Sequence, residues 1–230
     1  MSESGYHGPM RQPFSPLSLL LLVLGIALIL AFIQVGLITI AFDKLGLTAS
    51  QAMLLLLASL LGSGINLPLV SIRAEPSSAT PPRPMLGMLR MPPVPFTGKT
   101  VIAVNVGGCI IPIVFSLALL HNNPVTLSEA GVAIGMITAF SYVVSRPVPG
   151  IGIGIPVLLA PLAAAMVAIV INPEHAAPLA YVCGTLGVLI GADLLRMKDV
   201  RKLGAPMASI GGAGTFDGIF ITGIVAVLLA

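Results

Sequence analysis

Two aspartates stand in apolar segments of this chain, where a carboxylate is costly. Asp217 follows "SIGGAGTF" and precedes "GIFITGIVAVLLA", and Asp193 lies within "GTLGVLIGADLL". A charged aspartate near the centre of a bilayer costs about 2.5–3.5 kcal/mol on insertion scales, so it marks function by default. A pair of such carboxylates carries a proton, coordinates a cation, or shares one proton as an acid–base dyad. We therefore predict a functional role for both aspartates.

Two asparagines lie at the same expected depth as these carboxylates. Asn66 stands in "GINL" and Asn105 in "VNVGGCIIPI". With a helical rise of 1.5 Å per residue, Asn105 falls roughly 8 Å past Lys99, in the cytoplasmic half of a bilayer. The same reasoning places Asn66, Asp193 and Asp217 in that half. The sequence thus predicts one site for a cation, a proton or a small polar solute, formed by Asn66, Asn105, Asp193 and Asp217.

Glycines beside these residues predict breaks in the helices. Non-helical backbone at membrane depth is tolerated only where protein or water covers it, so the breaks would line the site. "GGAG" is not a phosphate loop, because no "GK[ST]" follows it. The predicted break positions are Gly107, Gly108, Gly211, Gly212 and Gly214.

Both aspartates also have structural interpretations. Asp193 lies close enough to a span end to cap the last turn or to pair with Arg196 or Lys198. Asp217 would cap a helix that begins near Thr215, offsetting the helix dipole. These alternatives stay open at the level of sequence.

The elements that must position these residues are membrane spans. The chain is 57% hydrophobic and 8% charged, whereas soluble domains carry roughly 25% charged residues. The apolar residues fall in runs of the length that crosses a 30 Å core. The fold class is therefore predicted as an all-α polytopic membrane bundle of about seven transmembrane helices. We place them at Leu17–Phe42, Ser50–Val70, Thr100–Leu120, Ser128–Ser145, Ile151–Ile171, Ala176–Leu195 and Ser209–Ala230.

The distribution of basic residues predicts the orientation. If the spans alternate, one side carries all but one of the Lys and Arg residues, and the other side carries Lys44 alone. The positive-inside rule then places the N-terminus in the cytoplasm and the C-terminus outside the cell membrane. Residues 1–16 form a cytoplasmic tail, residues 17–230 the transmembrane domain, and residues 71–99 a proline-rich cytoplasmic loop. The basic side holds Arg11, Arg73, Arg83, Arg90, Lys99, Arg146, Arg196, Lys198, Arg201 and Lys202.

Short similarities predict an internal repeat. "VNVGGCIIPI" aligns with "ASIGGAGTFD", which matches Asn105 with Ser209, and "GINL" aligns with "GADL", which matches Asn66 with Asp193. Spans two and three therefore resemble spans six and seven in order and orientation. This predicts three spans, a connecting fourth and three more (3+1+3), related by an axis along the membrane normal. Parallel repeats of this kind are a common transporter plan.

Metal, cofactor and nucleic-acid chemistry find no support in the sequence. Cys109 and Cys183 are two isolated residues in apolar segments, with neither disulfide nor metal spacing. The histidines are scattered over termini and loops, and the sparse basic residues lie beside spans rather than in a nucleic-acid patch. We predict no metal and no cofactor. The partners expected are the lipid bilayer, a small ion or solute, and a second copy of the chain in a homo-oligomer.

The chain resembles a prokaryotic family of uncharacterised multi-pass membrane proteins, catalogued as domain of unknown function sixteen-fourteen. The resemblance rests on "GSGINLPL", "VNVGGCIIPI", "GTLGVLIGADLL" and "IGGAGTFDGIFITGIVAVLLA". It implies a membrane location and no particular activity. A weaker likeness links Asp193 and Asp217 to the aspartates of presenilin-type intramembrane proteases. The chain departs from their "GxGD" motif, because "GAGTFD" places the aspartate two residues late, and it lacks their later "PAL" sequence.

Three functions follow as hypotheses. The first is a small transporter or channel with the carboxylate and amide site. The second is an intramembrane aspartyl hydrolase that uses Asp193 and Asp217 as acid and base. The third is a membrane scaffold or assembly factor without a small-molecule site. A short distance between the carboxyl groups would favour the hydrolase, and a through-going polar cavity would favour transport.

Overall fold

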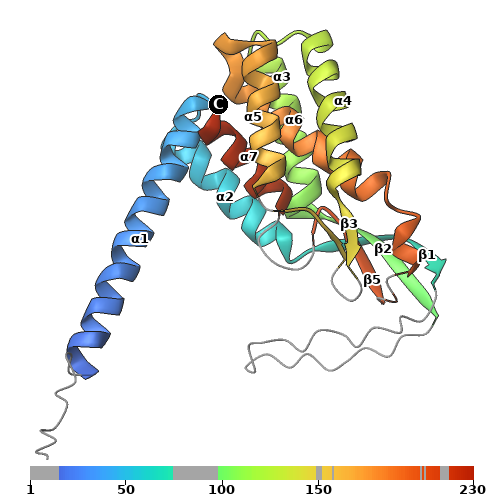
Figure 1. Ribbon diagram of the computed structural model, residues 1–230, viewed down its shortest axis with the longest axis horizontal. Helices are drawn as coiled ribbons and strands as arrows, with labels where there is room; N and C mark the ends of the chain where they lie inside the picture. The colour runs from blue at the N-terminus through green and yellow to red at the C-terminus, as the bar shows by residue number, and fades with distance from the viewer. Residues whose placement is uncertain are drawn as a thin grey trace, which may run out of the picture. The chain divides into compact units, whose positions relative to one another are not determined.

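A computed structural model describes residues 16–74, 98–148, 152–156, 158–202, 204, 206–212 and 218–230. The chain forms two units, Met1–Ile38 and Thr39–Ala230. Most of the chain is helical (Figure 1). Within these described residues, three stretches of helix are long and apolar enough to cross a membrane, namely Val23–Lys44, Leu127–Val144 and Pro173–Leu194. These helices give the molecule the character of a membrane protein, as its composition predicts.

In the part of the chain that the structure describes, there are seven α-helices and several short helical turns. The α-helices are α1 (Pro16–Lys44), α2 (Ala49–Ser63), α3 (Ile111–Asn122), α4 (Leu127–Val144), α5 (Leu159–Ile171), α6 (Ala176–Val188) and α7 (Gly218–Leu229). Two π-helices, η1 (Val106–Ile110) and η3 (Leu189–Leu194), lead into α3 and out of α6. The 3₁₀ turns are η2 (Pro173–His175) and η4 (Asp199–Lys202).

Capping residues in the sequence determine where two of the helices begin. Thr48 and Gln51 form a capping box at the start of α2, and Thr126 and Glu129 form another at the start of α4. In each box the threonine hydroxyl and the N3 side chain satisfy backbone N–H groups that the first helical turn leaves without partners. The turn between α1 and α2 contains Gly46, whose φ of 72° suits glycine.

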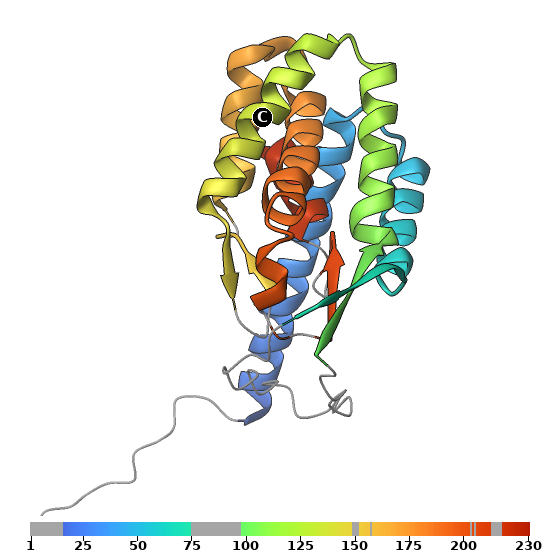
Figure 2. The same ribbon diagram turned by 90° about the vertical axis from the view of Figure 1, so that its right-hand side faces the viewer.

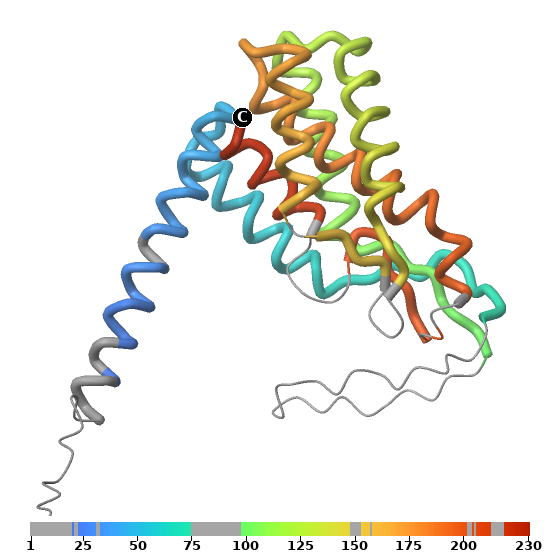
Figure 3. Tube along the Cα trace, viewed as in Figure 1, coloured from blue at the N-terminus to red at the C-terminus, as the bar shows by residue number. Residues whose placement is uncertain are grey.

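The expectation of an all-α bundle is wrong in one respect, because five strands form two small sheets among the described residues. The larger sheet has the order β1–β2–β5, with β1 (Asn66–Arg73) antiparallel to β2 (Lys99–Asn105), and β5 (Met207–Ile210) parallel to β2. The smaller sheet pairs β3 (Arg146–Val148) with β4 (Gly152–Gly154). Figure 1 shows β1, β2, β3 and β5 together near one end of helices α3 to α6, and the Cα trace in Figure 3 follows the same course.

Strands β1, β2, β4 and β5 occupy the ends of spans that the sequence predicts as continuous helix. The predicted span Ser50–Val70 is helical only to Ser63, and the predicted span Thr100–Leu120 opens as strand β2. An uninterrupted apolar run does not distinguish a buried helix from a strand. Pro68 removes a backbone donor that a helix would need, and the β-branched residues of "TVIAV" favour extended backbone.

Helix α6 forms the centre of the core. It packs against α3, α4, α5 and α7, and Figure 2 shows it enclosed by other helices. Nearly all its residues are buried, because small side chains allow neighbours to approach closely. A Cβ added at Gly187 would lie 2.7 Å from Ile137 Cβ, and one at Gly223 would lie 2.7 Å from Thr185 Oγ1.

The end of the bundle opposite the larger sheet contains the α1–α2 turn and the C-terminus. The Lys44 ammonium donates hydrogen bonds of 3.4 Å to the carbonyl oxygens of Val227 and Leu228, in the last turn of α7. A cation there offsets the partial negative charge of the helix C-terminus. By contrast, Arg73 and Lys99 pair at the far end of the β1–β2 ladder. The basic residues of these elements therefore lie at opposite ends of one unit.

The predicted 3+1+3 repeat stays a prediction. One feature of the fold resembles such a repeat. Strand β2 leads through η1 into α3, and β5, which runs parallel to β2, precedes α7. The sequence aligned Asn105 with Ser209, whereas the ladder pairs Ala103 with Ser209.

Candidate functional site

Asn105 ties three parts of the chain together where β2 meets the π-helix η1. Its Nδ2 donates to the Ser63 carbonyl oxygen at 2.7 Å and to Asn66 Oδ1 at 3.1 Å. Its Oδ1 accepts from the Gly108 N–H at 2.7 Å, which caps η1. The side chain is 2% exposed. Three charge-free hydrogen bonds in a buried position fix the end of α2 against the start of η1.

Asn66 extends this network to the third strand. It faces Asn105 in the antiparallel register, at the junction of β1 with α2. Its Oδ1 accepts from Asn105 Nδ2 and also from the Ser209 hydroxyl on β5. The two predicted asparagines therefore meet side chain to side chain. Ser209 joins them, although the sequence analysis named it only as an aligned residue and not as part of the site.

Asp193 lies in the π-helix η3 that ends the α6 segment. A π-helix widens the turn and is often found at functional sites. Asp193 is partly buried, and its Oδ2 accepts the Gly211 N–H at 2.7 Å. A carboxylate offers two oxygens with about four lone-pair sites, and this bond uses one of them. The carboxylate thus holds the glycine turn that follows β5.

The glycines at this junction allow backbones to touch. Gly211 has a φ of 76°, and a Cβ there would lie 2.6 Å from Cys109 Cβ and 2.7 Å from the Gly108 carbonyl carbon. A Cβ on Gly212 would lie 3.0 Å from Asn105 Cβ. The β5 turn therefore rests directly on η1 and on Asn105. This contact joins the amide network to the Asp193–Gly211 bond within one small region.

A second close approach fixes η1 against α2. A Cβ on Gly107 would collide with the backbone of Ser59, Gly62 and Ser63. The Ser59 hydroxyl donates to the Gly107 carbonyl oxygen at 2.8 Å, in a buried position. Gly107 and Gly108, predicted as helix breaks, are thus part of a π-helix packed on α2.

Arg196 has other partners than the predicted Asp193. Its Nη1 pairs with Asp199 Oδ2 at 3.3 Å, and its Nη2 donates to the Tyr142 carbonyl oxygen at 2.6 Å. Its Nε donates to the Ser145 hydroxyl at 3.1 Å, and the guanidinium carbon lies 4.7 Å from the centroid of the Tyr142 ring. Arg196 therefore fastens the end of η3 to the end of α4.

The other half of the predicted carboxylate pair lies outside the described residues. Asp217 and Gly214 both fall in 213–217, between the Gly211 turn and α7. The binding roles of Asn66, Asn105, Asp193 and Asp217 stay predictions. Among the described residues, no three His, Cys, Asp or Glu side chains gather as metal ligands would.

The depth of the junction follows from the strands. A strand rises about 3.3 Å per residue, so the six steps from Lys99 to Asn105 cover about 20 Å. The helical rise assumed for the sequence gave less than half of that distance. The amide network therefore lies well away from the charged ends of β1 and β2, where the sheet meets the helices.

The fold defines a class of protein that is mostly helical and has helices suited to crossing a membrane. Its site places the Asp193 carboxylate of a π-helix against the glycine turn that follows β5. The chain belongs to the family described as "Protein of unknown function (DUF1614)", which matches residues 60–229. The match confirms the family resemblance drawn from the motifs, and it includes every residue of the candidate site. No curated protein and no solved structure matches the chain.

Proposed function

We propose that this chain is a multi-pass cell-membrane protein that binds and moves a proton or a small cation at a site centred on Asp193, together with Asp217. The observation that carries the proposal is the 2.7 Å bond between Asp193 Oδ2 and the Gly211 N–H. It joins a carboxylate on one interrupted helix to the glycine turn before another. Transporter sites are commonly built from discontinuous helices of this kind.

The larger sheet supports a position for the chain in the membrane. Sheet edges with open N–H and C=O groups do not occur in lipid-exposed hydrocarbon, and β1 and β5 are the edge strands of the larger sheet. The hydrocarbon core therefore covers the helices, and the strands project into the cytoplasm. The junction that holds Asn66, Asn105 and Asp193 then lies near the inner membrane–water boundary. The N-terminus is cytoplasmic and the C-terminus lies outside, with Lys44.

The residues divide into two roles at this boundary. The Asn66, Asn105 and Ser209 side chains are hydrogen-bonded to each other and to the backbone, so they position the turns. Asp193 supplies the charge, and its ionised form attracts a cation while its protonated form carries a proton. Asp217 is the second carboxylate that the sequence predicts for this site, and it follows Gly211 by six positions in the chain.

Flux through proteoliposomes tests the proposal. The full chain is reconstituted, and proton, Na⁺ and K⁺ movement is followed under imposed gradients for the wild type and Asp193→Asn. The asparagine retains a carbonyl oxygen for the Gly211 N–H but does not ionise. We expect flux to fall on the order of tenfold or more, because an amide neither binds a proton at neutral pH nor carries charge.

Asp43→Asn is the matched control, because Asp43 is exposed in the last turn of α1. This variant removes one carboxylate without touching the junction, and its flux should equal that of the wild type. Equal flux through the wild type and Asp193→Asn, with both proteins folded, would overturn the proposal.

A second candidate is the intramembrane aspartyl hydrolase. The same Asp193–Gly211 bond favours it, because the segment "GGAGTF" that leads to Asp217 begins at the Asp193 carboxylate. Cleavage of a model transmembrane peptide in mixed micelles, detected by mass spectrometry, tests it. Cleavage lost in both Asp193→Asn and Asp217→Asn, without ion flux in the wild type, would replace transport by hydrolysis. An uncleaved peptide rejects the hydrolase.

A further inference from the structure

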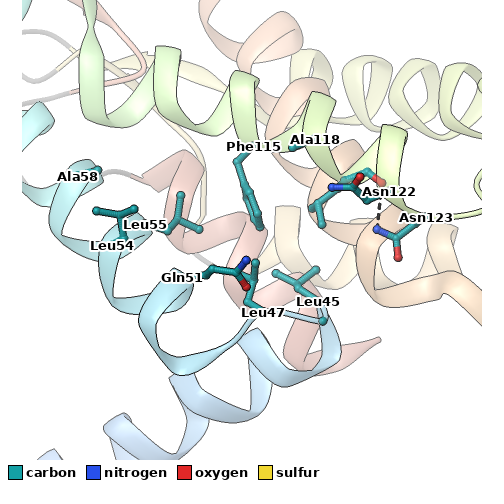
Figure 4. Close-up of a pocket in the computed structure, with 12 residues that line it drawn as sticks. Leu45, Leu47, Gln51, Leu54, Leu55, Ala58, Phe115, Ala118, Asn122 and Asn123 are labelled. Carbon is teal, nitrogen blue, oxygen red and sulfur yellow. Dashed lines mark hydrogen bonds between the residues drawn. The ribbon is translucent and has the colours of Figure 1, made fainter.

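An apolar pocket of about 550 Å³ lies between α2 and α3, near the α1–α2 turn. Figure 4 shows its walls, with leucines of α2 on one side and Phe115 projecting from α3 on the other. Pockets of roughly 300–1,000 Å³ hold small organic ligands. This pocket shares no lining residue with the Asn66–Asn105–Asp193 junction. It is lined by Leu45, Gly46, Leu47, Gln51, Leu54, Leu55, Ala58, Phe115, Ala118, Leu119, Asn122 and Asn123.

The lining is amphiphilic, with uncharged amides from the outer ends of its helices. Gln51 lies in the first turn of α2, and Asn122 and Asn123 lie at the end of α3. Gln51 Oε1 accepts from the Thr48 N–H at 2.9 Å, which leaves its NH₂ group as a donor. Asn123 Nδ2 donates to the Leu119 carbonyl oxygen at 2.9 Å, which leaves Asn123 Oδ1 as an acceptor.

A single basic residue stands beside this polar end. Lys44 directly precedes Leu45, the first residue of the lining. The three segments that connect the helices at this end, 45–49, 121–127 and 171–176, contain no Lys or Arg. The Lys44 ammonium has three donors, and the two carbonyl oxygens of α7 accept at the long distance of 3.4 Å. An anion beside the pocket therefore has one cation available.

We propose that this pocket binds a membrane phospholipid, with one acyl chain between α2 and α3 and the phosphate at the amide end beside Lys44. Apolar walls exclude a polar solute, because unpaired polar groups are costly to bury. The Gln51 NH₂ group and the Lys44 ammonium are donors that suit a phosphate monoanion. The proposal rests on the membrane placement given above, but it does not depend on chemistry at Asp193. The lipid would stabilise the α2–α3 pair that carries Ser63 and η1 to the junction.

Tryptophan fluorescence tests this directly, because the chain contains no Trp. Phe115→Trp places one reporter in the pocket, and Leu55→Trp places one on the opposite wall. The full chain in detergent is titrated with phosphatidylglycerol that carries brominated acyl chains, which quench at short range. We expect saturable quenching of both reporters, with a plateau at one lipid per chain. Leu117→Trp, on an exposed part of α3 outside the lining, should instead report quenching that rises linearly with lipid.

Two variants give the result that decides the proposal. Ala118→Phe fills the pocket from an exposed position and should weaken saturable binding on the order of tenfold, because it displaces several methylene groups. Leu117→Phe makes a similar change outside the lining and should leave binding unaltered. Lys44→Gln should reduce the preference for phosphatidylglycerol over phosphatidylcholine. Linear quenching at Phe115→Trp and Leu55→Trp, or saturable binding indifferent to Ala118→Phe, would overturn the inference. Because ion flux is not measured, failure here leaves the Asp193 proposal intact.

Discussion

At the scale of single residues, the asparagines and aspartates of the site do different work. Asn105 makes three hydrogen bonds in a buried position, whereas Asp193 is partly buried and makes one bond to the Gly211 backbone. An amide side chain is suited to a buried hydrogen-bond network, because it donates and accepts hydrogen bonds without the desolvation cost of a charge. The Asp193 carboxylate is the group of the two that can ionise. Replacing each type should therefore affect different properties.

Asn105→Ala should destabilise the protein by about 2–4 kcal/mol, because each buried group left without a partner costs about 1–3 kcal/mol. The Gly108 N–H and the Ser63 carbonyl oxygen would both lose their bond to this side chain. Reversible unfolding in mixed micelles measures the change. Asn123→Ala is the control, because the Asn123 side chain donates one hydrogen bond, to the Leu119 carbonyl oxygen of its own helix. Its loss should cost under about 1 kcal/mol. Equal losses for the two variants would contradict the structural role of Asn105.

At the scale of elements, the junction that holds Asn105 and Asp193 depends on π-helices that adjoin α-helices. The π-helix η1 begins directly after β2, and η3 continues α6 past Val188. Each brings a glycine against a neighbouring backbone. Gly107 of η1 lies on α2, and a Cβ at Gly191 of η3 would lie 2.9 Å from Ser141 Cβ on α4. Backbones packed this closely leave no room for a side chain. Adding a single methyl group, as in a glycine-to-alanine substitution, should therefore push the two elements apart.

Gly107→Ala should cost about 1–3 kcal/mol or more, the range typical of overpacked cores, because its Cβ meets the backbone of α2 rather than a movable side chain. Gly135→Ala on α4 is the matched control, since nothing lies within 4 Å of a Cβ there. It should be neutral or stabilise α4 by about 0.5–1 kcal/mol, through the better helix propensity of alanine. Thermal unfolding of the two purified variants compares them. Similar midpoints would contradict the close packing of η1 on α2.

At the scale of the whole molecule, the larger sheet lies at one end of the unit formed by residues 39–230, and Lys44 lies at the other end. Arg73 and Lys99 end the β1–β2 ladder, and Lys44 contacts the last turn of α7. This separation within residues 39–230 agrees with the charge asymmetry of the sequence. It supports a cytoplasmic sheet and an external C-terminus.

Cysteine labelling checks this orientation, because Cys109 and Cys183 are both buried and give little background. Ser128→Cys stands at the exposed start of α4, and Arg73→Cys stands at the exposed end of β1. An impermeant maleimide should label Ser128→Cys on intact cells and label Arg73→Cys only after the membrane is permeabilised. The reverse pattern would invert the proposed orientation.

The sequence by itself determined the family, the membrane-protein character and much of the helix positions. Its predicted spans Leu17–Phe42 and Ser128–Ser145 lie within a few residues of α1 and α4, because long apolar runs and capping boxes are local signals. It also selected Asn66 and Asn105, which prove to be hydrogen-bonded to each other.

Only the tertiary structure decided what happens at the ends of the other spans. The sequence of an apolar run such as "NLPLVSIR" does not distinguish a helix from a strand. The strand is decided only when a partner strand pairs with it. The strand partners of β1 lie 26 to 39 positions away in the sequence, and the side-chain partners of Asn66 lie 39 and 143 positions away. Hydrogen bonds between such distant groups leave no local pattern, so the ties through Ser63, Ser209 and Gly211 became visible only once the chain was folded.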